Sequence, residues 1–196
     1  MNARTKTRSL AITLVMMFAL LLPLATPIWA AEPEETTATV SFTPGQLTLI
    51  QTPALDFGNH SIEATTQVYE ATNEITPVQV SDLRGGQGGW TLTATLSPFT
   101  LTDGITETLQ GAYIEIENVA VSGVNETEGT APTLGANLKL EADGTETAFL
   151  TAAVGAGSGV WQAAWAKNDI SLSVLPGTAR TGANNATLTW TLQAAD

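Results

Sequence analysis

Apolar and polar residues alternate with a period of two along most of the chain, beginning near Ala38. Short alternating runs rich in Thr, Val, Ile and Leu are typical of half-buried β-strands, and turn dipeptides such as Asp143-Gly144 separate them. The pattern therefore predicts an all-β, mostly antiparallel sandwich or barrel-like domain with little helix. The predicted strands cover residues 37–43, 46–50, 55–58, 76–83, 90–97, 112–121, 136–142, 145–153, 169–175 and 186–194.

One stretch, VWQAAWAK at residues 160–167, has the three- and four-residue apolar spacing of a helix. A short helix and a further strand both fit it. If the stretch is helical and exposed, Trp161 and Trp165 form an aromatic patch suited to sugar or protein contact. A core or hinge role explains the two tryptophans equally well.

The triplet Trp-Thr-Leu occurs near the middle of the chain and again close to its end. On extended strands Trp90 shares a face with Leu92, and Trp190 shares a face with Leu192, while threonines occupy the opposite faces. Indole rings stack on sugars, so both tryptophans are candidate ligand contacts. Because both lie on leucine faces, we favour a core position, on two strands that could be neighbours in one sheet.

The start of the chain has the features of an export signal: basic residues, then an apolar run over residues 10–22, then small residues around Ala30. The sequence predicts a signal peptide at residues 1–30, a short acidic flexible leader at 31–37, and one domain at 38–196. An uncleaved membrane anchor is the alternative, which the prolines after the apolar run disfavour. After cleavage we expect no stable membrane insertion.

Loss of the signal would leave four basic residues against 19 acidic ones, a formal charge of −15. Nucleic-acid binding relies on Lys and Arg displacing counterions, so this charge excludes it. The chain has no cysteine, so an exported domain of this size must be stabilised by its core rather than by disulfides.

Two segments, SDLRGGQGGWTLTATLS at residues 81–97 and TGANNATLTWTLQAAD at residues 181–196, follow the predicted signal. Together they resemble the WxL-domain surface proteins of low-GC Gram-positive bacteria. The resemblance implies a secreted, cell-surface protein held noncovalently at peptidoglycan or another wall polymer, often beside wall-anchored partner proteins. The matching positions are Asp82, Arg84, Trp90, Leu92, Trp190 and Leu192.

Polar residues and glycines before the first triplet are further candidate contacts. The glycines of residues 84–89 can adopt positive φ or bring the backbone close to a ligand, although a plain flexible connection also explains them. Asp82 and Arg84 stand two residues apart, so they share a face of an extended strand and can pair with each other or with a partner. On this basis we expect Arg84→Ala to weaken binding with little change in melting temperature.

Catalytic and metal chemistry have little support in the sequence. His60 is the only histidine, and we expect no catalytic residue, no metal site and no cofactor. Glu115 and Glu117 share a strand face, as paired glycosidase carboxylates can, but their alternation with isoleucines favours a solvent-facing side. LPGTA at residues 175–179 is interpreted as a turn rather than as a covalent anchor signal.

The sequence therefore predicts a nonenzymatic protein that binds peptidoglycan directly. The alternative is a structural subunit that docks onto another wall-anchored surface protein and touches peptidoglycan only indirectly. Gram-positive wall polymers carry phosphate and carboxylate groups, so a domain of this charge cannot be held there by simple charge attraction. Contact must come from hydrogen bonds and stacking, from bridging divalent cations, or from a protein partner.

Overall fold

A computed structural model of the chain describes residues 37–86, 88–103 and 106–195. The chain divides into two units, Met1–Ser41 and Phe42–Asp196, and every strand of the described residues belongs to the second. The predicted signal peptide, residues 1–30, lies outside the described residues, as does the predicted leader except for Thr37.

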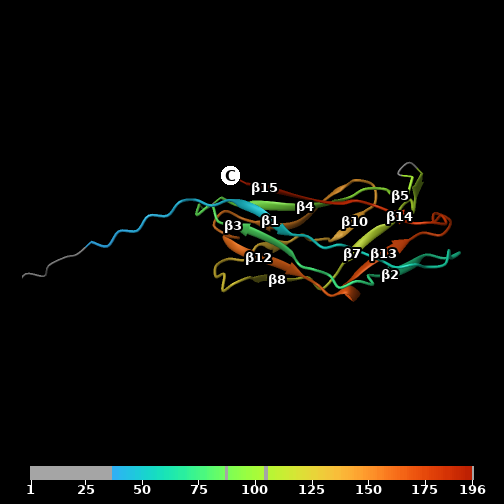
Figure 1. Cartoon of the computed structure of the whole chain (residues 1–196), viewed down its shortest axis with the longest axis horizontal. Helices are drawn as coiled ribbons and strands as arrows, with labels where there is room; N and C mark the ends of the chain where they lie inside the picture. The colour runs from blue at the N-terminus through green and yellow to red at the C-terminus, as the bar shows by residue number, and fades with distance from the viewer. Residues whose placement is uncertain (1–36, 87, 104–105, 196) are drawn as a thin grey trace, which may run out of the picture. The chain divides into compact units, whose positions relative to one another are not determined.

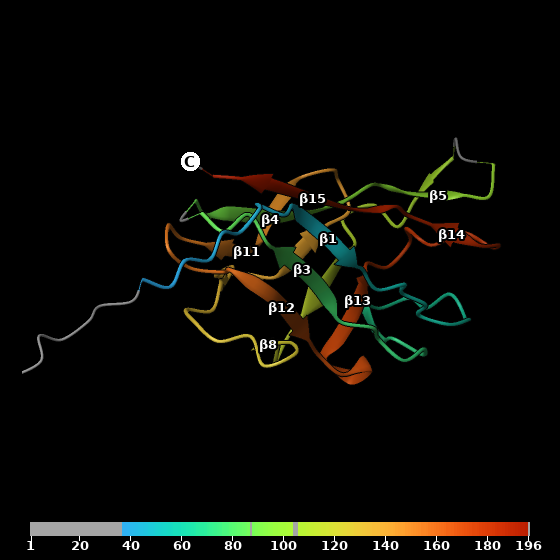
Figure 2. The same cartoon turned by 60° about the vertical axis from the view of Figure 1, so that its left-hand side comes forward.

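The strands form four sheets in which every paired strand is antiparallel (Figures 1 and 2). The first contains, in order of pairing, β1 (Leu47–Gln51), β3 (Val78–Asp82), β12 (Gly159–Ala164) and β8 (Ala120–Gly123). The second contains β10 (Lys139–Glu141), β7 (Tyr113–Ile116), β13 (Ile170–Val174) and β2 (Gln67–Glu70). The third contains β15 (Leu188–Ala194), β4 (Trp90–Leu96), β11 (Glu146–Ala152) and β9 (Thr133–Leu134). The smallest contains β14 (Asn184–Asn185), β5 (Phe99–Leu101) and β6 (Glu107–Thr108).

Alternation along the strands builds one hydrophobic core that draws on all four sheets. In β4, Trp90, Leu92, Ala94 and Leu96 are at most 2% exposed, while the intervening threonines are only half-buried. On the neighbouring strand β11, Phe149 is fully buried as well. The strand that carries the first triplet therefore contributes a side chain at every second position to the hydrophobic burial on which a chain without disulfides depends.

The predicted fold class is confirmed. The domain is all-β and antiparallel, none of its sheets closes into a barrel, and its single helical element within the described residues is the 3₁₀ turn η1 (Lys167–Asp169). In residues 160–167 the strand alternative is the correct one, because β12 runs to Ala164. The interpretation of Trp161 and Trp165 as an exposed aromatic patch is wrong, because they are only 5% and 7% exposed.

Two of the predicted strands do not form, and five strands were missed, namely β2, β5, β6, β9 and β14. Residues 37–43 contain no strand, and Phe42 is 87% exposed, so this apolar alternation has nothing to pack against. Residues 55–58 are irregular because Asp56 Oδ1 accepts the Gly58 N–H at 2.8 Å, a local turn that competes with sheet pairing. Of the missed strands β2 is the longest, and its run QVYE alternates as the predicted strands do.

We expect Trp90→Ala to lower the free energy of unfolding by about 3–5 kcal/mol, the usual cost of truncating a fully buried aromatic side chain. Trp190 is only half-buried, so we expect Trp190→Ala to cost about half as much. Urea unfolding followed by far-UV circular dichroism measures both values. A Trp90→Ala protein of unchanged stability would contradict the core position.

Candidate functional site

Both Trp-Thr-Leu triplets lie in one sheet, on the neighbouring strands β4 and β15 (Figures 1 and 2). Each tryptophan stands opposite an alanine and the two leucines stand opposite each other, in the pairs Trp90–Ala194, Ala94–Trp190 and Leu92–Leu192. The alanines leave room beside each indole, and the leucine pair packs across the strands. The expectation that the triplets lie on neighbouring strands is therefore confirmed.

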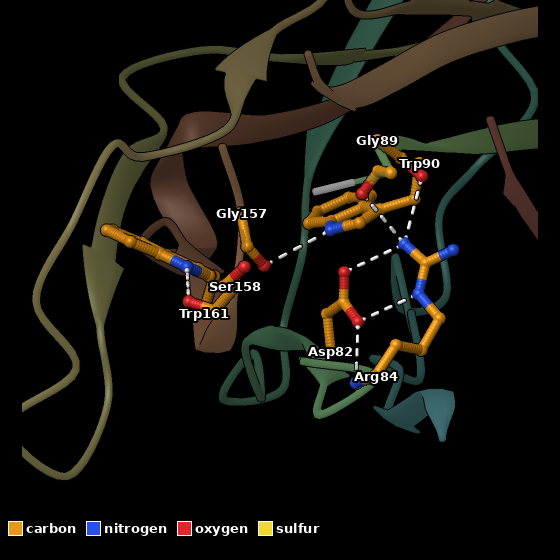
Figure 3. A network of polar contacts seen from close by, with 8 residues as sticks. Asp82, Arg84, Gly89, Trp90, Gly157, Ser158 and Trp161 are labelled. Atoms are coloured by element: carbon orange, nitrogen blue, oxygen red, sulfur yellow. Dashed lines mark hydrogen bonds and ion pairs between the residues drawn. The ribbon is translucent and has the colours of Figure 1, made fainter. Parts of the chain in front are cut away.

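The Trp90 indole is held inside the domain at a defined position. It is fully buried, and its Nε1–H donates to the carbonyl oxygen of Gly157 at 3.2 Å (Figure 3). Gly157 has a φ of +72°, and a Cβ there would stand 2.7 Å from Trp90 Nε1 and 2.5 Å from the Cβ of Ala152. Only glycine fits this position, so the indole and the glycine loop require each other. In this position Trp90 has no surface with which to touch a ligand.

The other tryptophans of the described residues, Trp161, Trp165 and Trp190, also pack against the protein. Trp190 meets the ring of Phe149 edge-on at a centroid distance of 4.8 Å, and Phe149 meets Trp165 at 5.7 Å. Trp161, next to β3 in the first sheet, donates its Nε1–H to the carbonyl oxygen of Ser158 at 2.9 Å (Figure 3). Such edge-to-face pairs add stability beyond the area they bury. The four tryptophans of the candidate site are thus parts of the scaffold, and Trp190 alone keeps partial exposure.

Asp82, at the end of β3, forms a bidentate ion pair with Arg84 (Figure 3). Arg84 Nε donates to Asp82 Oδ1 at 2.9 Å, and Arg84 Nη2 donates to Asp82 Oδ2 at 2.8 Å. The Asp82 side chain is 4% exposed and that of Arg84 is 27% exposed. The sequence left open whether Asp82 and Arg84 pair with each other or with a partner; in the structure they pair with each other. This arrangement has the planar geometry that makes Arg–carboxylate pairs strong.

The same guanidinium also holds the start of β4 and, through it, the end of the chain. Arg84 Nη2 donates to the carbonyl oxygens of Gly88 and Gly89, each at 3.0 Å. The Gly89 carbonyl in turn accepts the N–H of Ala195 at 2.9 Å. A Cβ on Gly89 would stand 2.3 Å from the carbonyl oxygen of Ala152, so glycine is required there for close approach. We call Asp82, Arg84, Gly89, Trp90 and Gly157 the signature cluster.

The Arg84 side chain, by hydrogen bonding to the carboxylate, lowers the pKa of Asp82 below its ordinary value of 3.8, against the opposing effect of burial. Asp82 is therefore ionised at neutral pH, and its charge is compensated locally. This geometry revises the expectation for Arg84, because its removal would leave a buried carboxylate without its cation. The main effect of removing Arg84 is therefore a loss of folding stability.

The described residues form a half-open groove of about 1160 Å³. Residues 53–63 and strand β2 contribute to its lining on the N-terminal side, and residues 179–188 do so on the C-terminal side. Buried side chains, including Leu96, Phe99 and Leu172, also line it. Strands β2, β5 and β14 lie at the opposite end of the sheets from the C-terminal end of β15, as Figures 1 and 2 show.

The groove combines aromatic, polar and charged groups. His60 stacks on Tyr69 with ring centroids 3.9 Å apart and an interplanar angle of 15°, and both residues line the groove. Its charged side chains are Asp56, Glu63 and Arg180, apart from any charge on His60. Sequence reasoning missed this surface because its N-terminal side is mostly irregular backbone. The alternation in QVYE could have placed Tyr69 beside a predicted sheet.

The part of the chain that the structure describes offers few candidate residues for metal binding or catalysis. No group of three or more His, Asp or Glu side chains there could hold a metal ion. Glu115 and Glu117 are exposed, as the alternation predicted, and Glu115 stands opposite Lys139 on the neighbouring strand. The described residues also contain no helix that is long and apolar enough to span a membrane.

The fold and the signature cluster define an all-β domain organised around a pair of W-x-L strands. The family model described as WxL domain surface cell wall-binding matches residues 22–195, so the chain belongs to the WxL family. It is accordingly a cell-wall-binding domain of the cell surface. Searches of curated proteins and of solved structures found no match.

Because Arg84 compensates a buried carboxylate, we expect Arg84→Ala to lower the free energy of unfolding by about 2–4 kcal/mol, somewhat below the cost for a fully buried pair. Lys167→Ala is the matched control. It removes a surface ion pair with Glu74, whose side chain is 91% exposed, and should change stability by less than about 0.5 kcal/mol. Urea unfolding measures both, and equal effects would contradict a structural role for Arg84.

The lowered pKa of Asp82 predicts a pH dependence. The ion pair contributes its full stability above the ordinary carboxyl pKa, and this contribution is lost as the pH falls through the lower pKa of the folded state. The stability difference between the wild type and Asp82→Asn should therefore shrink between pH 6 and about pH 3. Urea titrations at several pH values test this, and a constant difference would be the contrary result.

Proposed function

We propose that this protein attaches noncovalently to the Gram-positive cell wall by binding peptidoglycan directly. Membership of a cell-wall-binding family supports attachment, and the groove supports direct contact. A half-open hollow of about 1160 Å³ with aromatic and polar walls suits a polymer segment better than a flat surface does. The groove is the observation that carries the proposal.

The charge of the protein restricts how such a wall contact works. A formal charge of −15 after signal removal opposes approach to anionic wall polymers. Within the groove, Asp56 and Glu63 outnumber the cation Arg180. Hydrogen bonding and stacking therefore supply the binding energy, and binding depends little on ionic strength.

Export and processing belong to the same proposal. Residues 1–30 direct the protein out of the cell and are removed, residues 31–37 form a short leader, and residues 38–196 form the wall-binding domain. The domain acts as a binding module without catalytic residues or a cofactor. Its site of action is the wall on the outer surface of the cell.

One observation favours the alternative, docking onto another wall-anchored protein. Strand β1 lies at the edge of its sheet, and Ile50 on it is 53% exposed. Leu83, directly after the neighbouring strand β3, is 57% exposed. Open edges with exposed apolar side chains are common sites for strand addition by a partner.

Sedimentation with purified, protein-free peptidoglycan distinguishes the two functions. Direct binding predicts that the domain pellets with the sacculi without any partner and that 0.5 M NaCl releases less than about half of it, because charge attraction contributes little. Soluble domain alone, spun without sacculi, is the control. Retention that needs an added wall-anchored protein would instead establish docking.

A further inference from the structure

We propose that the groove between residues 53–63 and 179–188 binds the glycan strand of peptidoglycan, a chain of β-1,4-linked N-acetylated amino sugars. This inference rests on the proposed function and specifies which part of the polymer is bound and where. The W-x-L residues serve the site indirectly: Trp90 and Leu92 are buried near the start of β4, away from its groove-lining end, and Trp190 and Leu192 lie beside β4 on β15 without lining the groove.

The groove is built from the C-terminal segment that also carries the second triplet. Residues 181–188 line the groove, and residues 188–194 continue as β15 beside β4. Leu96 and Leu188, opposite each other on the two strands, line the groove as well. A half-open groove accepts a polymer whose ends continue beyond the protein, so its form suits a glycan strand.

The aromatic pair provides a platform for a sugar ring. Tyr69 is half-buried and supports the exposed ring of His60 from one side, at a centroid distance of 3.9 Å. His60 is also held near the backbone by a hydrogen bond with the carbonyl oxygen of Phe57. A planar ring fixed in this way presents its outer face to the C–H face of a pyranose. Ile62, 56% exposed in the same lining, offers an apolar contact for an acetyl methyl group.

The polar groups of the lining favour the sugar chain over the stem peptide. Neutral hydroxyl and amide side chains that can bond sugar hydroxyls are exposed there, namely Asn59, Ser61, Thr181, Asn185 and Thr187. The carboxylates of Asp56 and Glu63 exceed the one guanidinium of Arg180, which disfavours a peptide that carries carboxylates. The glycan is therefore the part of peptidoglycan that fits.

Two unfavourable features lie in the lining of this groove. Leu109, in its lining, has a φ of +46°, a left-handed conformation that large side chains rarely adopt. The Oδ1 atom of Asn184, also in the lining, is buried without a hydrogen-bond partner within the described residues. Strain and unpaired polar atoms of this kind cluster at binding sites, where the surroundings hold them in place.

Titration of the ¹⁵N-labelled protein with the β-1,4-linked tetramer of N-acetylglucosamine tests the inference by NMR. We expect amide shifts confined to the residues that line the groove and their immediate neighbours, mainly residues 53–69 and 172–188. His60→Ala should raise the dissociation constant about tenfold or more. His60→Phe keeps a planar ring, so its dissociation constant should stay within about threefold of the wild-type value. Val68→Ala is the matched control: Val68 lies on β2, is 63% exposed and does not line the groove, so its loss should leave binding unchanged.

Other outcomes overturn the inference without touching the proposed function. If the wild type pellets with sacculi but does not bind the tetramer, or binds a soluble stem peptide instead, peptidoglycan is the ligand and the glycan groove is wrong. Shifts that map outside the groove, or equal affinity of His60→Ala and Val68→Ala, overturn it as well. Failure of the wild type to pellet with sacculi counts against the proposed function itself.

Discussion

The ion pair between Asp82 and Arg84 is the interaction on which the rest of the structure depends. One guanidinium joins the end of β3 to the start of β4, and the Gly89 carbonyl that it holds also receives the last strand through Ala195. An uncompensated carboxylate at this depth would be costly, so the folded chain requires that the pair stay intact. The D-x-R and G-W residues that precede the first triplet's leucine are thus explained by one local geometry.

Strand β4 transmits that geometry across the domain. Its first residue, Trp90, is fixed by Gly157 within the signature cluster, and its last, Leu96, lines the groove. Strand β15 runs beside it in unbroken register, with Leu188 opposite Leu96. Because the core is close-packed, a shift at the cluster would displace the groove lining too. In the proposed function, the motif therefore acts on wall binding through position, whereas the residues of the groove supply the contacts.

Sequence periodicity was enough to obtain the fold class, most strands and the inward direction of Trp90, since burial on one face leaves a direct two-residue pattern. The same logic failed for Phe42, where alternation exists without a sheet to pack on. It was also silent on the groove, because residues 53–63 and 179–188 are far apart in sequence and mostly irregular. Arg84 shows a further limit: its spacing from Asp82 indicated a pairing, but only the burial of Asp82 reveals that the pair is structural.

The glycines of the first segment illustrate how a family motif and a binding surface can be separate. Gly89 and Gly157 are required where backbone or indole atoms approach too closely for a Cβ, which is a demand of packing rather than of mobility. The close approaches at Gly89 and Gly157 do not involve residues 53–63. The exposed side chains of that segment can therefore change without disturbing the signature cluster. A chain that keeps the cluster and alters this segment keeps its fold while changing what its groove binds. The W-x-L motif thus identifies a scaffold, and in the proposed function the segments at its far end decide which ligand is bound.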